Sequence, residues 1–313
     1  MSETATLVCN EVWGGNGAAA TPLTRPGLEG FVYSLPYHDE AAGGDVHYVS
    51  SCGTGRITRV MLADVMGHGE SAADVAGYLR SLMRRYLNHI EPHNLASEVS
   101  RLLHSEPAGE GRFATSVILT FFAPTGELSL CNAGHPAPLL YRQRDARWHA
   151  LPRRADKPYA TNLPLGIEEG EGYDEQVLGL DPGDAVLLYT DGIIEATTSR
   201  GEQLGAEGLR NVLEELGSPA KWADSNGVCD RVMGVIRNRG YGFEADDVSI
   251  VLLRCVGRSN GAGMREKLSA MARTLRDIGR GATVPWPEAS VRNLLGGVLP
   301  PLSQVKPKHR GSS

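Results

Sequence analysis

Short apolar, β-prone runs separated by glycine- and proline-containing turns fill much of residues 28–256. The runs 45–49 and 56–65 are joined by a Gly-containing loop and predict a β-hairpin. A second hairpin is predicted from the runs 114–123 and 127–133, which are separated by a Pro-Thr-Gly turn. The pattern therefore favours antiparallel pairing of neighbouring strands.

A helical period follows the first hairpin. Within residues 70–90, apolar side chains recur every three or four positions. Arginines occupy much of the opposite side, which is typical of a solvated helix face. Shorter helical patterns cover residues 94–105, 204–216 and 221–239.

Residues 142–172 are charged and contain prolines, so we expect a long loop there, packed down at its apolar segment 163–167. The remaining predicted strands are 28–36, 138–141, 173–178, 185–190 and 248–256.

The composition is that of an ordinary globular protein, with 41% hydrophobic and 22% charged residues among 313. A net charge of −6 gives no attraction for nucleic acid or for an anionic membrane. No apolar run is long enough to span a bilayer, and no signal peptide is recognisable, so we expect a cytoplasmic protein. The five cysteines include no Cys-x-x-Cys pair, which argues against a zinc knuckle or a disulfide framework.

Three parts of the chain are expected. A Gly- and Ala-rich N-terminal extension covers residues 1–27, a globular domain covers 28–256, and a C-terminal extension covers 257–313. Residues 263–281 have the pattern of a basic, weakly amphipathic helix, and the Pro- and Lys-rich residues from 300 onward are expected to be disordered.

Carboxylates stand at the ends of four predicted strands. Asp45 begins one strand, Asp64 and Asp191 each end one, and Asp246 with Asp247 precedes the last. Each of these residues alone is more simply explained as a turn former or helix cap. The alternative to a shared site is therefore four unrelated turns, but four such ends together favour convergence.

Converging carboxylates without a counter-charge raise one another's pKa, and a divalent cation relieves that repulsion. Oxygen ligands without cysteine favour Mg2+ or Mn2+ over Zn2+. Two such ions about 3.5–4 Å apart would activate a bridging water and hold a phosphoryl group in line for attack. The pattern therefore indicates metal-assisted hydrolysis of a phosphate ester.

Six short segments also carry a family resemblance over about residues 31–254. They are Gly43-Gly44-Asp45, Asp64-Val65-Met66-Gly67-His68-Gly69, Asn132-Ala133-Gly134-His135-Pro136, Leu163-Pro164-Leu165-Gly166-Ile167, Tyr189-Thr190-Asp191-Gly192 and Asp246-Asp247-Val248-Ser249. In this order they resemble the PPM-type metal-dependent protein serine/threonine phosphatases, which are protein phosphatase 2C-like, in the bacterial SpoIIE-type branch.

The resemblance implies an α+β fold, a four-layer α-β-β-α sandwich of two antiparallel sheets flanked by helices. It also implies a cleft that holds two Mn2+ or Mg2+ ions. By the same resemblance, Asp64 bridges both metals, Val65 offers its backbone carbonyl, and Asp191 and Asp246 are further direct ligands. Asp64, Asp191 and Asp246 are therefore the expected catalytic residues.

Other positions follow the family pattern less closely. Asp45 resembles the carboxylate that holds metal-bound water, and Asp247 stands where relatives have Asn or Asp, so both are included as metal ligands. Eukaryotic relatives have a histidine where this chain has Met66, and His68 is not assigned as a general acid. His135 is interpreted as a turn residue that bonds local backbone.

The resemblance implies a phosphatase acting on a phosphorylated regulatory protein, such as an anti-sigma-factor antagonist in a bacterial partner-switching pathway. A catalytically weak phosphatase-like binding module is the alternative, and the presence of Asp64, Asp191 and Asp246 argues against it. A metal-dependent nucleotide phosphodiesterase is disfavoured because the motifs have neither an Arg/Lys phosphate clamp nor an aromatic base platform nearby.

Overall fold

The structure is a computed structural model. It describes residues 12–51, 55–66, 70–86, 91–105, 113–151, 162–168, 172–219, 228–243 and 246–261. Gly67, His68 and the predicted helix 263–281 lie outside the described residues. None of the described helices is long and apolar enough to cross a membrane.

The first sheet has six strands in the order β1-β4-β5-β6-β7-β10, and all neighbours are antiparallel. Its strands are β1 (Val12–Gly15), β4 (Asp45–Ser51), β5 (Ile57–Val65), β6 (Ala114–Phe122), β7 (Glu127–Ala133) and β10 (Gln176–Gly179). The strands β4 and β5 form the first predicted hairpin, and β6 and β7 form the second. Both hairpin predictions are therefore confirmed.

The second sheet also has six antiparallel strands, in the order β2-β3-β14-β11-β8-β9. Its strands are β2 (Ala19–Arg25), β3 (Leu28–Leu35), β14 (Val248–Cys255), β11 (Ala185–Tyr189), β8 (Leu139–Arg142) and β9 (Arg147–Ala150). A separate two-stranded ribbon pairs β12 (Thr197–Thr198) with β13 (Tyr241–Gly242).

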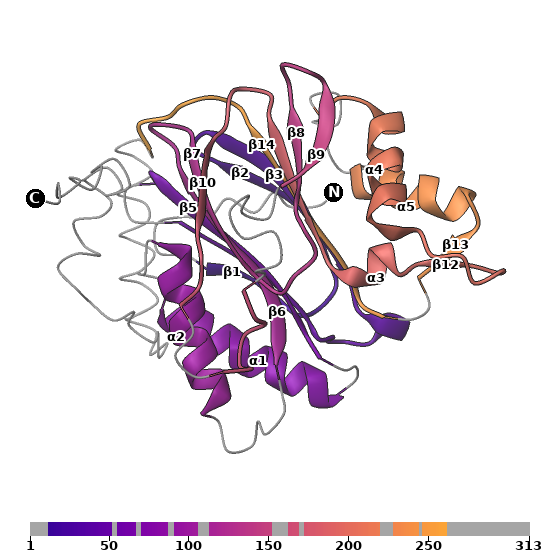
Figure 1. Cartoon of the computed structure of the whole chain (residues 1–313), viewed down its shortest axis with the longest axis horizontal. Helices are drawn as coiled ribbons and strands as arrows, with labels where there is room; N and C mark the ends of the chain where they lie inside the picture. The colour runs from indigo at the N-terminus through magenta and orange to yellow at the C-terminus, as the bar shows by residue number, and fades with distance from the viewer. Residues whose placement is uncertain are drawn as a thin grey trace, which may run out of the picture.

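Helices cover the outer face of each sheet, so the layers run helix, sheet, sheet, helix (Figure 1). The first sheet is covered by α1 (Glu70–Arg85) and α2 (Pro92–His104). The second is covered by α3 (Asp191–Ile194), α4 (Gly205–Leu216) and α5 (Val228–Asn238), and the short η1 (Tyr37–Asp39) follows β3. This is the predicted α-β-β-α sandwich of an α+β fold.

Strand alternation decides which side chains fill which layer. On β5, Leu62 packs between the sheets while Met61 packs under the helices. On β11, Leu188 faces the inner layer and Tyr189 faces the helices of the second sheet. Consequently both sheets are apolar on both faces along most of their length, which explains why their strands read as nearly continuous apolar runs.

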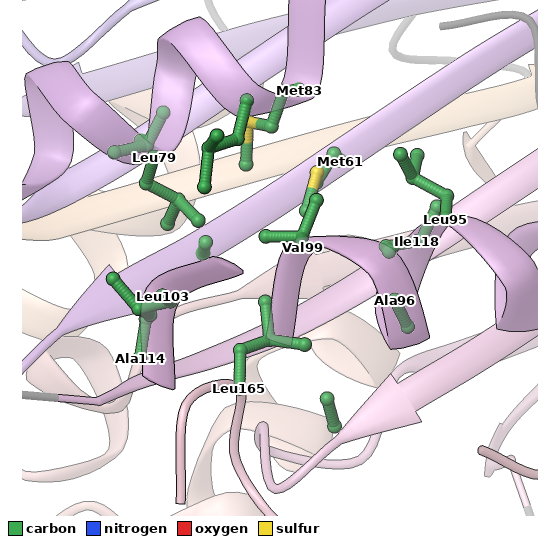
Figure 2. Close-up of a cluster of buried hydrophobic side chains, with 14 of the residues drawn as sticks. Met61, Leu79, Met83, Leu95, Ala96, Val99, Leu103, Ala114, Ile118 and Leu165 are labelled. Atoms are coloured by element: carbon green, nitrogen blue, oxygen red, sulfur yellow. The ribbon is translucent and has the colours of Figure 1, made fainter. Parts of the chain in front are cut away.

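The helix-facing core of the first sheet confirms the predicted periodicity of residues 70–86. Figure 2 shows Leu79 and Met83 from α1 and Val99 from α2 gathered over Met61 of β5. Leu165 joins this cluster from the segment 162–168, where its backbone bonds Ala114 in both directions. The apolar segment 163–167 is therefore packed down, as predicted.

Two parts of the chain differ from the expected element boundaries. The expected loop at 142–172 contains β9, a short edge strand on which only Trp148 is buried, so it carries no apolar run to announce it. The expected extension at 1–27 contains β1 and β2, which add an edge strand to each sheet. The boundaries at 28 and 256 themselves stay a prediction.

Candidate active site

The layer between the two sheets is apolar in its middle and acidic at one end. On β5, Leu62 is packed between the sheets, and Asp64 follows on the same face. On β14, Val251 is part of the same inner layer, and Ser249 and the preceding Asp247 continue that face toward the same end. The inward-facing side chains of β5 and β14 therefore form an apolar core between the sheets, and the carboxylates at one end of these strands form its rim. We call this group of carboxylates the rim.

Asp45 and Asp64 face each other across the β4–β5 hairpin, where they are direct register partners. Asp45 is only 3% exposed, whereas Asp64 is partly exposed. The hairpin prediction thus correctly brings the two carboxylates together, because the loop between the strands fixes their register.

Thr190 connects the second sheet to this pair. Its hydroxyl donates a hydrogen bond to Asp45 Oδ2 at 2.9 Å and accepts one from the Ser249 backbone N–H at 2.9 Å. The Ser249 hydroxyl in turn lies 3.0 Å from that of Ser34 on β3. Thr190 and Ser249 are fully buried, so their hydrogen bonds are shielded from competing water.

Asp247 holds the start of β4 in place. One carboxylate oxygen accepts the Tyr37 backbone N–H at 2.6 Å, and the other accepts the N–H groups of Gly44 at 2.6 Å and Asp45 at 3.2 Å. A Cβ at Gly43 would lie 2.4 Å from this carboxylate, so only glycine lets the chain pass so closely. The Gly43-Gly44-Asp45 segment therefore packs closely against the Asp247 carboxylate and donates backbone hydrogen bonds to it.

Asp191 and Asp246 complete the rim from the second sheet. Asp191 is the first residue of α3 rather than the last of a strand, because β11 ends at Tyr189. Asp246 accepts the Asp247 backbone N–H at 2.8 Å. A Cβ on Gly192 would lie 2.1 Å from the Asp247 carbonyl oxygen, so this glycine allows α3 to approach the Asp246-Asp247 turn.

The electrostatics of the rim are those of crowded like charges. Burial raises the pKa of Asp64 to about 9, together with the smaller effects of the neighbouring charges of Asp45, Asp191, Asp246 and Asp247. Burial also raises the pKa of Asp45, against the hydroxyls of Ser249 and Thr190. Such a set of oxygen donors suits a divalent cation, since only added positive charge would let all of them ionise together.

The carboxylates are gathered but not closed into a ligand cage. In the described part of the chain, no three His, Cys, Asp or Glu side chains are arranged so that they could hold a metal ion as they stand. Val65, the expected backbone ligand, donates its N–H to the Gly44 carbonyl at 3.3 Å, and its side chain is buried under the helices.

Residues 54–256 match the family of stage II sporulation protein E (SpoIIE). The chain belongs to the SpoIIE family. The matched range contains Asp64, Asp191, Asp246 and Asp247 but begins after Asp45. The family recognised from the six sequence segments is thereby confirmed.

Individual proteins agree with the SpoIIE assignment. The phosphoserine phosphatase RsbP of Bacillus subtilis (strain 168) is 31% identical over 144 residues, which cover 45% of this chain and 34% of that protein. The structure of the RsbU and RsbW domains of Rv1364c from Mycobacterium tuberculosis matches with a TM-score of 0.62 and 26% identity, over 84% of this chain and 72% of that one.

A more distant structure shows the same fold. RsbX in complex with magnesium matches with a TM-score of 0.55 and 14% identity, over 75% of this chain and 99% of that one. Our chain spans about a third of the length of RsbP, so the two share one region rather than a whole architecture.

His135 of this SpoIIE-family chain lies inside the fold, beside the rim. Its backbone N–H bonds the Asn132 side chain at 2.8 Å, as a turn residue would, but its Nδ1 also lies 2.8 Å from the hydroxyl of Thr115, the register partner of Asp64. Burial lowers the pKa of His135 to about 3, with an opposing contribution from the Tyr189 backbone. The local bonding was predicted, and the contact with Thr115 was not.

Sequence reasoning assigned no role to Thr190 or Ser249, although both lie in the quoted SpoIIE-type segments. The signal that could have found them is the strand period. Thr190 lies two residues after Leu188, just past the end of β11, and Ser249 lies two residues before Val251 on β14, so both continue the inner faces of these strands.

Proposed function

We propose that this chain is a metal-dependent phosphatase that removes phosphate from serine or threonine of a regulatory protein. The observation that carries the proposal is the gathering of five aspartates from both sheets at one end of an otherwise apolar layer. Carboxylates placed this way destabilise a protein unless a cation compensates them, so their presence together argues for a ligand rather than for stability.

The residues that would hold two Mn2+ or Mg2+ ions are Asp64 as the bridging ligand, Asp191, Asp246 and the Val65 carbonyl. When bound, such ions lower the pKa of a coordinated water and polarise the phosphoryl group. The magnesium complex of RsbX, which shares this fold, supports a divalent metal in general. Comparing activity with Mn2+ and with Mg2+ will show which ion supports turnover.

The other two carboxylates, Asp45 and Asp247, have a positioning role in this proposal. Asp45 is held on one side by Thr190 and is buried, so its orientation toward Asp64 is restricted. Asp247 is assigned to the metal site by its place in the sequence, and it already accepts three backbone hydrogen bonds. We therefore propose that Asp247 acts mainly by fixing the backbone of Gly44 and Asp45.

The substrate follows from the relatives and remains a proposal. RsbP is a phosphoserine phosphatase, and Rv1364c joins an RsbU domain to an RsbW domain. We propose that the substrate is a phosphorylated protein of a partner-switching pathway, of the anti-sigma-factor antagonist type. A phosphatase-like binding module with weak turnover is the alternative, and it predicts retained partner binding without hydrolysis.

The test is hydrolysis of an aryl phosphate and of a phosphoserine peptide with Mn2+, with Mg2+ and with EDTA. We expect activity only with metal, and loss of activity in Asp64→Ala and Asp191→Ala. Asp181→Ala is the matched control, because Asp181 is an exposed carboxylate in the turn before β11. Turnover in EDTA, or turnover that survives both substitutions, would refute the mechanism; metal binding without turnover would favour the binding module.

A further inference from the structure

Thr115 on β6 lies between Asp64 and His135. It is the direct register partner of Asp64, and such partners project from the same face of an antiparallel sheet. Two residues further along β6, Val117 belongs to the inner apolar layer, so Thr115 and Asp64 both face the space between the sheets. The strand β7, which ends two residues before His135, pairs with the other side of β6. Thr115 therefore separates a carboxylate of the rim from a buried imidazole.

The two ring nitrogens of His135 have unequal surroundings. The side chain is only 5% exposed, and its Nδ1 lies 2.8 Å from Thr115 Oγ1. Its Nε2 is buried and makes no hydrogen bond of ordinary geometry within the described part of the chain, although the Tyr189 backbone lies close enough to raise the pKa of the ring. A buried polar atom that is incompletely bonded destabilises a fold, whereas phenylalanine would fill similar space without that cost. Packing alone therefore does not explain a histidine at this position.

The backbone that carries the imidazole is held from both sides. Asn132 Oδ1 accepts the His135 backbone N–H at 2.8 Å, and Asn132 Nδ2 donates to the His135 carbonyl at 3.0 Å. Asn162 Nδ2 in turn donates to the Asn132 carbonyl at 2.9 Å. These bonds fix the point from which the side chain projects, so the ring is restricted to its place against Thr115.

The partners of the ring nitrogens indicate where the proton of the neutral imidazole lies. A neutral imidazole has one N–H donor and one acceptor nitrogen. The Tyr189 backbone opposes the lowering of the His135 pKa, as a carbonyl acceptor does, and Nε2 is the nitrogen left to face it. With the proton on Nε2, Nδ1 is the acceptor, and the Thr115 hydroxyl donates to it.

We propose that His135 is a positioning residue of the rim, which holds the Thr115 hydroxyl with its proton toward Nδ1 and its lone pairs toward Asp64. An oxygen held in this way cannot donate to the Asp64 carboxylate, so it leaves the carboxylate oxygens free for a cation. It can also accept a hydrogen bond from water beside Asp64. The inference rests on the proposed function for the cation, but the orientation of the ring and the hydroxyl does not depend on it.

The ring geometry is tested without metal by 15N NMR of the histidine side chains in EDTA. The His135 signals are identified by their loss in His135→Phe. We expect the proton on Nε2, and we expect Thr115→Val to shift the Nδ1 resonance because it removes the hydrogen-bond donor. A proton on Nδ1, or an Nδ1 resonance that Thr115→Val leaves unchanged, would overturn the proposal.

Mn2+ binding to the full-length chain, measured by isothermal titration calorimetry, tests the effect on the rim. Thr115→Val keeps the shape of the side chain but removes the hydroxyl. We expect it to weaken Mn2+ binding by about tenfold or more, as is usual for residues that orient metal ligands. Thr115→Ser retains the hydroxyl and should bind Mn2+ nearly as tightly as the native chain. Equal weakening in the Val and Ser variants would contradict a role for the hydroxyl.

Variants of His135 separate positioning from packing. His135→Phe should weaken Mn2+ binding as Thr115→Val does, yet leave the melting temperature in EDTA unchanged or higher, because an incompletely bonded polar atom is gone. His135→Asn places its amide atoms as many bonds from the backbone as Nδ1 and should recover part of the affinity. His149→Phe is the matched control, because His149 is exposed and bonds Asp145 at the surface.

The double variant Thr115→Val with His135→Phe shows whether the two residues act as a unit. If His135 acts through Thr115, the double variant should bind Mn2+ no more weakly than Thr115→Val alone. Additive losses, or native affinity in His135→Phe, would overturn the proposal. A native chain that does not bind Mn2+ would instead refute the proposed function, and the position of the ring proton in EDTA would then decide the present proposal.

Discussion

The middle and the end of the layer between the two sheets are built from the same strands but do opposite things. In the middle, Leu62 and Val251 are fully buried among apolar neighbours and stabilise the sandwich. At the end, Asp64 lies on the same face of β5 as Leu62, Asp247 directly precedes β14, and the two bring like charges together. The core therefore stabilises the fold, whereas the crowded carboxylates of the rim destabilise it. A local arrangement that lowers stability is typical of a functional site.

The largest expected effect is on catalysis at the rim. Asp64→Ala should reduce hydrolysis of a phosphoserine peptide by at least roughly a thousandfold, about 4 kcal/mol of transition-state stabilisation, because the carboxylate that we propose to bridge the two metal ions is lost. The same variant should be at least as stable as the native chain in EDTA, since one member of a crowded set of charges is gone. A variant that is both inactive and strongly destabilised would contradict the contrast between rim and core.

A substitution at Leu62, two residues before Asp64 on β5, should affect stability rather than activity. Leu62→Ala removes a fully buried side chain from the inner layer and should lower the free energy of unfolding by about 2–5 kcal/mol. Denaturant titration measures this loss. Activity per folded molecule should change far less than in Asp64→Ala, and an equally large loss of turnover would show that core and rim are not separable.

The pH dependence of the metal-free protein sharpens the comparison. Asp64 has a folded-state pKa of about 9, far above its ordinary value, because of burial and neighbouring carboxylates. The folded chain then binds more protons than the unfolded chain, so stability is lost as pH rises toward 9. The melting temperature in EDTA should therefore fall by several degrees between pH 7.5 and pH 9. His135 acts mainly below this window, because its pKa is about 3 in the folded chain and near 6.5 in the unfolded chain, so it adds stability as pH rises between those two values.

Asp64→Asn is the control for that titration, because the asparagine side chain is similar in size to aspartate but cannot ionise. The fall in melting temperature should be shallower in this variant and in native protein saturated with Mn2+. A slope that is unchanged in Asp64→Asn would assign the pH dependence to other groups.

The smallest expected effect is at Thr190, which joins the two sheets at the rim. Thr190→Val keeps the shape but removes the hydroxyl that bonds Asp45 and the Ser249 N–H, at a cost of about 1–3 kcal/mol. Mn2+ affinity, measured by calorimetry, should weaken, and Thr190→Ser should restore most of it. Equal affinities in the Val and Ser variants would show that the hydroxyl does not position Asp45.

Much of the fold could be predicted because its determinants are local. The hairpins of β4–β5 and β6–β7 follow from glycine-containing turns between apolar runs, and α1 follows from its three- and four-residue period. The strand β9 escaped prediction because an edge strand with one buried residue, Trp148, has no distinctive pattern. The roles of β1 and β2 as edge strands depend on which partners the chain folds back onto, and no local signal encodes that.

The sequence by itself determined the four longer described helices α1, α2, α4 and α5, the hairpins, the family and the pairing of Asp45 with Asp64, since each depends on nearby residues or on ordered motifs. Only the tertiary structure decided that Thr190 bonds Asp45 across the two sheets and that Asp247 holds the Gly44 backbone. It also buried His135 against Thr115. These contacts join residues from separate strands and turns, and their geometry is set by how the sheets stack, which depends on the packing of the whole inner layer.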